Sequence, residues 1–285
     1  MESYEPLRAL SLIARERCTV FNAVDMMATA MLEHPALDQY DRSSLRTGAF
    51  AAVGGGGHGL FEAVVERLGI RQAYQPYGMT EVNALCLLHE LDEPPELRGQ
   101  SGIKCVPGID ARIVHPDTGQ PCRAGEEGEL QFHGPLVTRG YYKKPEETEA
   151  AFTADGWFRT GDLAIQDAQG HVFFKGRLRE TLRISHFMVA PGEIEAFLMS
   201  HPDVEQAFVV GIPDEATNEA AVAYVIAREG AHLTEDELRA YCRGKIASYK
   251  IPRGVRFVKD VPRTPGPHGD KIQRGKLKEQ ARQDF

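Results

Sequence analysis

The sequence is poor in the features that mark secreted, zinc-binding or membrane proteins. Its 285 residues include five cysteines, which lie far apart and form no Cys-x-x-Cys pair. A scattered, odd-numbered set fits reduced thiols better than a disulfide framework or a zinc site. No basic stretch at the start leads into an apolar run, and no window is apolar for long enough to span a bilayer. We therefore expect a cytoplasmic, globular protein without a signal peptide or a membrane span.

Basic charge is also scarce. The chain has 33 Lys and Arg against 41 Asp and Glu, which gives a formal net charge of −8 and a pI of ≈5.7. Without a basic surplus to neutralise phosphates, the sequence argues against a nucleic-acid-binding protein. Hydrophobic residues make up 42% and charged residues 26% of the chain, which is ordinary for a globular protein long enough for roughly two domains.

Hydrophobic periodicity changes along the chain. The first third alternates helical and strand patterns, which predicts a mainly parallel, helix-covered sheet. Predicted helices lie at about 7–14, 24–32 and 60–68, and predicted strands at 19–21, 47–53 and 72–74. Short strands separated by turns follow at 111–114, 129–132 and 171–174.

The last third reads as a small α+β unit. Pro191 opens a predicted helix, strands are predicted at 204–210 and 220–226, and Thr234 with Glu237 forms a capping-box signature. From Pro262 we expect a loop and a loosely held end. The fold class is therefore α/β plus α+β: a partial α/β subdomain at 1–101, a β-rich subdomain at 102–178 and a small, mobile domain at 179–285.

Four motifs occur in a fixed order. They are YGMTE at 77–81, FRTGD at 158–162, GRLRE at 176–180, and PRT at 262–264 leading to KIQR at 271–274. Between them stand Gly128-Glu129-Leu130, Gly140-Tyr141-Tyr142 and the run PEET at 145–148. This ordered set resembles the C-terminal half of the AMP-forming acyl-CoA synthetases, in the adenylate-forming superfamily that also contains luciferases and peptide-synthetase adenylation domains. The likeness covers about residues 4–281.

The resemblance implies a site in which a carboxylate attacks the α-phosphorus of ATP and pyrophosphate leaves. The aromatic residue of YGMTE then packs against adenine, which falls to Tyr77 beside Gly78. The hydroxyl of Thr80 reaches the α-phosphate, and the carboxylate of Glu81 helps to hold Mg²⁺. A hydroxyl can donate to a phosphate oxygen, and Mg²⁺ takes one carboxylate with phosphates and waters. The alternative is a strand-to-loop turn with a merely exposed Thr and Glu.

The same resemblance implies that Asp162 and Arg177 bind the ribose of the nucleotide. An ionised carboxylate can accept two hydrogen bonds from a diol. The alternatives are an Asp that stabilises its own RTGD turn and an Arg that lies on the surface. Lys271 matches the family's catalytic lysine, which neutralises the charge that builds during attack. Its alternative is a solvated lysine, since Lys276 and Lys278 lie nearby.

Further positions are implied in the mobile domain. Arg179 occupies the hinge at which family members rotate this domain to admit the thiol acceptor. Arg183 matches a basic position beside the coenzyme A path, or else a strand residue facing solvent. His186 stands where the family usually has a glycine, and its side chain would narrow that path. The loop before Lys271 is three residues longer than the family's.

The run Gly54-Gly55-Gly56-Gly57 has two readings. Gly54, Gly56 and Gly59 satisfy the GxGxxG pattern of dinucleotide-binding folds, although no clear acidic residue ends the next strand. The family places a glycine turn here between the acyl pocket and the nucleotide, which gives that role to Gly54, Gly55 and Gly56.

The family's phosphate loop ending in Pro-Lys-Gly is missing from the sequence. We therefore expect a fragment, a truncated gene product or one half of a split enzyme, with a missing N-terminal half as a possible partner. The predicted function is an ATP-dependent carboxylic acid:CoA ligase that uses ATP, Mg²⁺ and coenzyme A and leaves AMP. The alternatives are a non-catalytic or partner-dependent fragment that binds AMP or acyl groups, and adenylation for a carrier protein.

Overall fold

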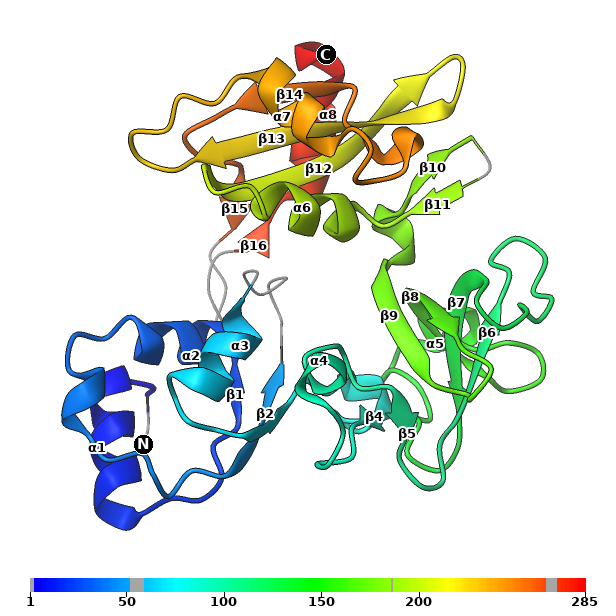
Figure 1. The fold of residues 1–285 in the computed structure, drawn as a ribbon. Coiled ribbons are helices and arrows are strands. Elements are labelled where there is room, and N and C mark those ends of the chain that lie inside the picture. Colours follow the sequence, from blue (N-terminus) through cyan, green and yellow to red (C-terminus); the bar gives the residue numbers. More distant parts are fainter. Residues whose placement is uncertain (1–2, 52–58, 186, 265–270) are drawn as a thin grey trace. The chain divides into compact units, whose positions relative to one another are not determined.

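The computed structural model describes residues 3–51, 59–185, 187–264 and 271–285 (Figure 1). The chain forms two compact units, one of Met1–Thr160 with Ala164–Phe174 and one of Gly161–Leu163 with Lys175–Phe285. Within the described residues, no helix has the length and apolar content that a membrane crossing requires. The predicted class, a parallel helix-covered sheet followed by β-rich and α+β parts, is confirmed.

The first unit opens with a three-stranded parallel sheet. Its strands, in the order β1 (Ala23–Val24), β2 (Thr47–Ala51) and β3 (Gln72–Tyr74), confirm the predicted parallel arrangement. Helices α1 (Pro6–Glu16), α2 (Asp25–Leu32) and α3 (Leu60–Glu66) supply much of its core, together with the short helix η1 (Leu37–Gln39). Pro6 stands in the first turn of α1, where its missing N–H costs nothing.

The strand predicted at 19–21 is wrong. Val20 makes only an isolated bridge to Thr47, and β1 begins later, at Ala23. The side chain of Asn22 accepts the N–H of Ala49 at 2.9 Å, so it takes a donor that a continuous ladder would use. A polar side chain has therefore divided the pairing of this segment.

The rest of the first unit is rich in strands, as predicted. After η2 (Thr80–Val82), the antiparallel pair β4 (Leu87–Leu88) and β5 (Lys104–Cys105) flanks the short α4 (Pro95–Arg98). A four-stranded sheet then has the order β6 (Asp110–Val114), β7 (Glu127–His133), β8 (Phe158–Gln166) and β9 (Val172–Arg177). Helix α5 (Pro145–Ala151) lies between β7 and β8 in sequence, and the core includes Leu130, Phe132 and Phe158.

The second unit is built on a five-stranded sheet (Figure 1). Its order is β11 (Phe187–Val189), β10 (Leu182–Ile184), β13 (Asn218–Ala227) and β12 (Val204–Asp214), with β14 (Gly254–Phe257) also paired to β13. Other elements are η3 (Leu178–Glu180), α6 (Pro191–Met199), α7 (Glu235–Cys242), η4 (Ser248–Lys250), the hairpin of β15 (Arg263–Thr264) and β16 (Lys271–Ile272), and α8 (Arg274–Asp284). The predicted helix at Pro191 and the two predicted strands are confirmed.

The long hairpin β12–β13 is buried on both faces, because its alternate residues enter different clusters. Val209 and Ala223 pack in the cluster that contains residues of α6 and α7, whereas Val210 and Val222 pack with residues of α8. A strand covered on both faces reads as a continuous apolar run rather than an alternation. This explains the uninterrupted apolar pattern of the sequence at 220–226.

The end of the chain differs from the prediction of a loosely held end. Helix α8 covers Arg274–Asp284, and its Leu277 and Ala281 are buried. Asp284 accepts a hydrogen bond from the hydroxyl of Tyr224 at 2.7 Å and pairs with Arg256 at 2.9 Å. The helix is held by two apolar side chains and by distant polar partners, and such a pattern is too sparse to be seen as periodicity.

Candidate nucleotide-binding residues

The YGMTE segment lies in the first unit, directly after β3. Tyr77 is 7% exposed, and its ring centroid lies 5.5 Å from that of Phe174 and 6.1 Å from that of Phe132. Thr80 starts η2 and is exposed. The segment thus anchors one aromatic ring in the core of the first unit and leaves the hydroxyl of Thr80 accessible to a ligand.

Gly78 allows the segment to fold back on itself. A Cβ at this position would lie 1.8 Å from the carbonyl oxygen of Ala84, so only glycine fits the backbone here. Ala84 itself has φ 73°, and its N–H donates to the carbonyl of Met79 at 3.0 Å. Residues other than glycine seldom adopt this left-handed backbone conformation, and those that do are concentrated at functional sites.

Glu81 is bound by the segment that follows β7. The N–H of Thr138 donates to the carbonyl of Glu81 at 2.7 Å, and the hydroxyl of Tyr141 donates to the Glu81 carboxylate at 3.1 Å. Burial, followed by this hydrogen bond to Glu81, raises the pKa of Tyr141. Sequence reasoning gave Tyr141 no role, although Gly140-Tyr141-Tyr142 belongs to the motif set. Spacing cannot reveal a contact across 60 residues.

Asp162 and Arg177 come together in the second unit. The Arg177 Nη1 lies 2.8 Å from the Asp162 Oδ1, and the side chains are 48% and 2% exposed respectively. The predicted RTGD turn is wrong, because Asp162 lies inside the continuous strand β8. Gly161, at φ 67°, bends that strand locally and gives the segment its turn-like composition. Two of the four sequence motifs therefore meet in a direct ion pair.

The other predicted residues of the second unit lie on short elements. Arg179 is exposed within η3, at the junction before β10. Arg183 is exposed in β10, and its backbone N–H donates to the Glu219 carboxylate at 2.7 Å. Lys271 lies in β16, where it is the register partner of Thr264 in β15.

The predicted site residues divide between the units. The first unit carries Tyr77, Gly78, Thr80 and Glu81, and the second carries Asp162, Arg177, Arg179, Arg183 and Lys271. The predicted positions Gly54, Gly55, Gly56 and His186 lie outside the described residues.

The predicted Mg²⁺ requires oxygen ligands, which limits the side chains that could bind it. No group of three or more His, Cys, Asp or Glu suited to a metal ion occurs in the part of the chain that the structure describes. A dedicated protein cage is not needed for Mg²⁺, which commonly takes one or two carboxylates with phosphates and waters. The accessible carboxylate of Glu81, fixed by Tyr141, fits that limited requirement.

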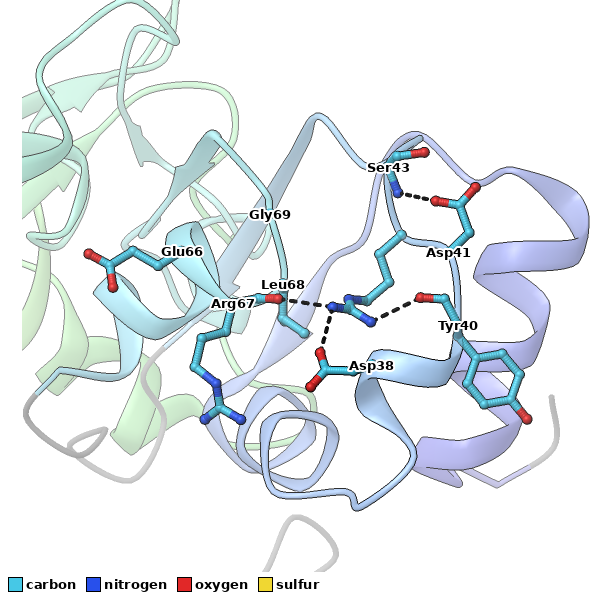
Figure 2. Close-up of a pocket in the computed structure, with 9 residues that line it drawn as sticks. Asp38, Tyr40, Asp41, Ser43, Glu66, Arg67, Leu68 and Gly69 are labelled. Carbon is cyan, nitrogen blue, oxygen red and sulfur yellow. Dashed lines mark hydrogen bonds and ion pairs between the residues drawn. The ribbon is translucent and has the colours of Figure 1, made fainter.

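A polar pocket of ≈370 Å³ lies in the first unit, and none of the predicted site residues lines it (Figure 2). It is lined by Asp38, Tyr40, Asp41, Arg42, Ser43, Glu66, Arg67, Leu68 and Gly69. The guanidinium of Arg42 donates to the carbonyls of Leu37, Tyr40 and Arg67 and to the carboxylate of Asp38. Because these bonds of Arg42 hold the surrounding backbone together, we assign the pocket a structural role and no ligand.

The chain matches two family models. Residues 1–142 match the AMP-binding enzyme model, and residues 193–266 match the AMP-binding enzyme C-terminal domain. Among curated relatives, YngI of Bacillus subtilis is 38% identical over 285 residues, which is 100% of this chain and 51% of that protein. The sulfoacetate–CoA ligase of Cupriavidus necator is 39% identical over 264 residues, 93% of this chain and 50% of that protein.

Solved structures agree with these matches. ATP-bound MatB from Rhodopseudomonas palustris has a TM-score of 0.85 and 29% sequence identity, covering 100% of this chain and 55% of MatB. The chain spans about half the length of the curated relatives it matches. The ordered motifs, both family models and the fold agree, and the chain belongs to the adenylate-forming superfamily of acyl-CoA synthetases and related AMP-binding enzymes.

Proposed function

We propose that this chain is the nucleotide-facing and lid-bearing portion of an ATP-dependent carboxylic acid:CoA ligase that works through an acyl-adenylate. In this proposal residues 1–101 and 102–178 belong to the large adenylating domain, and 179–285 form the mobile lid. A ligase of this class converts ATP and a carboxylic acid into an acyl-adenylate and pyrophosphate. Coenzyme A then displaces AMP and gives the thioester.

The observation that carries the proposal is the ion pair of Asp162 and Arg177. The Asp162 carboxylate is almost fully buried, and a buried charge is costly unless it is paired. Arg177 supplies the opposite charge at 2.8 Å while remaining about half exposed itself. A carboxylate held in place beside an accessible guanidinium supports the binding of a ribose diol.

The remaining roles follow the motif positions. Tyr77 and Gly78 lie beside adenine, and the Thr80 hydroxyl donates to the α-phosphate. Glu81 holds Mg²⁺, which neutralises phosphate charge when it is bound. Lys271 neutralises the charge that develops as the carboxylate attacks. Gly54, Gly55 and Gly56 border the acyl group or the nucleotide, Arg179 is the hinge, and Arg183 with His186 borders the path of coenzyme A.

Nucleotide binding is the first test, because it needs no chemistry. Titration calorimetry of the chain with AMP should give a saturable signal, and Asp162→Ala should abolish it. A matched control is Asp155→Ala, which removes another arginine-paired aspartate, bound to Arg112 in the first unit. Absence of AMP binding by the wild-type chain would contradict the proposed nucleotide site.

Adenylation is the second test. Pyrophosphate release with a panel of carboxylic acids should fall by about 10²–10³-fold in Lys271→Ala, the range for losing one donor to developing charge. Lys276→Ala is the control, because Lys276 is an exposed lysine in the adjoining helix α8. Equal rates for wild type and Lys271→Ala would remove the catalytic assignment of Lys271.

A second candidate is a partner-dependent or non-catalytic fragment that binds AMP or acyl groups. It differs from the first candidate in whether the matched half of the family fold completes adenylation by itself. Under this alternative the chain binds AMP but releases pyrophosphate only after addition of the separately produced N-terminal half of a relative. Transfer to a carrier protein instead of coenzyme A would be recognised by assaying both acceptors with a synthetic acyl-adenylate.

A further inference from the structure

Arg274 begins helix α8, three residues after Lys271, and faces two carboxylates. Its Nη1 and Nη2 lie 2.7 Å and 3.0 Å from the two carboxylate oxygens of Glu195 in α6. Its Nε lies 3.2 Å from the Oε2 of Glu180 in η3. The Nη1 group also donates to the carbonyl of Val209 in β12 at 3.2 Å. One side chain thus joins four elements of the second unit.

Glu195 is the buried member of this cluster, whereas the side chains of Arg274 and Glu180 are 26% and 31% exposed. Glu195 is 8% exposed, and its Oε1 also accepts the backbone N–H of Val209 at 2.8 Å. Burial by itself would lower the pKa of Arg274, but the bonds to Glu195 outweigh it and raise that pKa. Two-pronged Arg–carboxylate pairs fix orientation as well as charge, and a lysine cannot reproduce the fork.

The strand that carries Lys271 is held directly before this cluster. Thr264 is the register partner of Lys271, and the Gln273 N–H donates to the carbonyl of Pro262 at 2.8 Å. On the partner strand, Arg263 donates to Gln206 of β12 at 2.9 Å. Beyond Gln273, the Arg274 cluster fixes the chain to α6 and β12. The two-residue strand β16 is therefore held through its partner strand β15 and through the residues that follow it.

Glu180 connects the same cluster to the predicted hinge. It is the last residue of η3 and adjoins Arg179. Its contact with Arg274 uses Nε alone, whereas Glu195 takes both terminal nitrogens. The two arms are separable by mutation: the Glu195 arm anchors α8 to the core of the lid, and the Glu180 arm links it to the turn.

We propose that Arg274 is a positioning residue for Lys271, holding β16 in register with the lid core through Glu195 and with the hinge turn through Glu180. This inference rests on the proposed function, in which Lys271 acts in adenylation. It gives Arg274 no contact with substrate. Arg274 limits the position of β16, and so of Lys271, because it is bound to Glu195 of α6 and to Glu180 of η3.

Amide hydrogen exchange of the whole 285-residue chain tests the structural half without any activity. Arg274→Ala should speed exchange at 271–277 by about tenfold or more, since a weakened anchor lowers the local opening free energy. Exchange in α7 should be unchanged. Arg282→Ala, an exposed arginine of the same helix, is the matched control. Unchanged exchange at 271–277 in Arg274→Ala would overturn the proposal.

Kinetics test the functional half. A misplaced catalytic group can cost about 10²-fold, so Arg274→Ala should lower the kcat of adenylation by about 10- to 100-fold while the KM for ATP changes little. Arg274→Lys should recover only part of the rate. Thioester formation from a synthetic acyl-adenylate should fall much less. A parallel loss of both half-reactions and of AMP affinity would show a merely structural role.

Separate substitutions then distinguish the arms and the two proposals. Glu195→Gln should speed exchange at 271–277 more than Glu180→Gln, because Glu195 holds both terminal nitrogens of Arg274. Equal exchange in both would overturn the assigned division of the cluster. If the wild-type chain neither binds AMP nor adenylates any acid after an N-terminal half is added, the proposed function fails, whereas the exchange result still decides whether Arg274 anchors β16.

Discussion

The Nη1 of Arg177 and the Oδ1 of Asp162 lie 2.8 Å apart, which ties the end of β9 to the middle of β8. A hydrogen bond to a charged group contributes about 1.5–3 kcal/mol, equivalent to roughly 10- to 100-fold in affinity. Asp162→Asn should therefore weaken AMP binding by about that factor in calorimetry. Asp155→Asn is the control, and equal AMP affinity in Asp162→Asn and wild type would exclude a role for this carboxylate.

Replacing Gly78 should damage the first unit. The added Cβ in Gly78→Ala meets the Ala84 backbone carbonyl at 1.8 Å, so the backbone has to shift and we expect a loss of about 3 kcal/mol or more. Denaturant unfolding measures it. In the same unit, Gly119 has φ 69° and open space around it, so Gly119→Ala should cost only about 1–2 kcal/mol. Similar losses for both variants would contradict the steric argument.

Acid should weaken the first unit through Glu93. Its carboxylate lies 2.6 Å from the Lys104 Nζ and 2.9 Å from the His89 Nδ1. Burial opposes ionisation, but these two partners outweigh it and lower the pKa of Glu93. A lowered pKa in the folded state gives stability that is present above the unfolded pKa of about 4.3 and is lost as pH falls through the folded value.

The test is the pH dependence of unfolding. Glu93→Gln should lower the free energy of unfolding by roughly 1 kcal/mol at neutral pH and flatten its decline below about pH 4.3. Glu62→Gln, an exposed glutamate in α3, is a suitable control. The same acid-dependent slope in Glu93→Gln and wild type would show that the decline has another source.

The capping box of α7 is present as the sequence predicted. The Thr234 Oγ1 accepts the Glu237 N–H at 3.3 Å, and the Glu237 Oε2 accepts the Thr234 N–H at 2.9 Å. Thr234→Ala should lower stability by about 1 kcal/mol and speed hydrogen exchange in the first turn of α7. Thr234→Ser keeps the acceptor oxygen, so it should behave like wild type. An alanine variant with unchanged exchange would argue against the cap.

Local patterns predicted much of the fold because local physics determines those elements. Pro6 and Pro191 mark helix starts, since proline fits a first turn, and Thr234 announces its cap. Sequence alone failed where a distant partner decides. Asn22 interrupts a strand by bonding Ala49, and α8 is held by partners as remote as Tyr224.

The candidate site shows the same division. Family motifs gave Asp162 and Arg177, and the structure joins them. Neither motif order nor spacing could reveal that Tyr141 donates to Glu81 or that Glu195 holds Arg274. One weak indication was present in the sequence. Glu195 follows Ile194 in a helix with an apolar face, and a carboxylate buried beside that face requires a positively charged partner. The identity of that cation required the tertiary structure.

Among the described residues, α8 is the only helix that packs in the cluster of Phe208, Val210 and Val222 on one side of β12 and β13, where it contributes Leu277 and Ala281. The cluster also contains Val258, Val261 and Ile272. Detachment of α8 would expose an apolar surface of the sheet to solvent, and exposed apolar surfaces promote association between molecules. If the second unit moves as the proposed lid, we expect it to move as one body, because unfolding of α8 would expose this apolar surface.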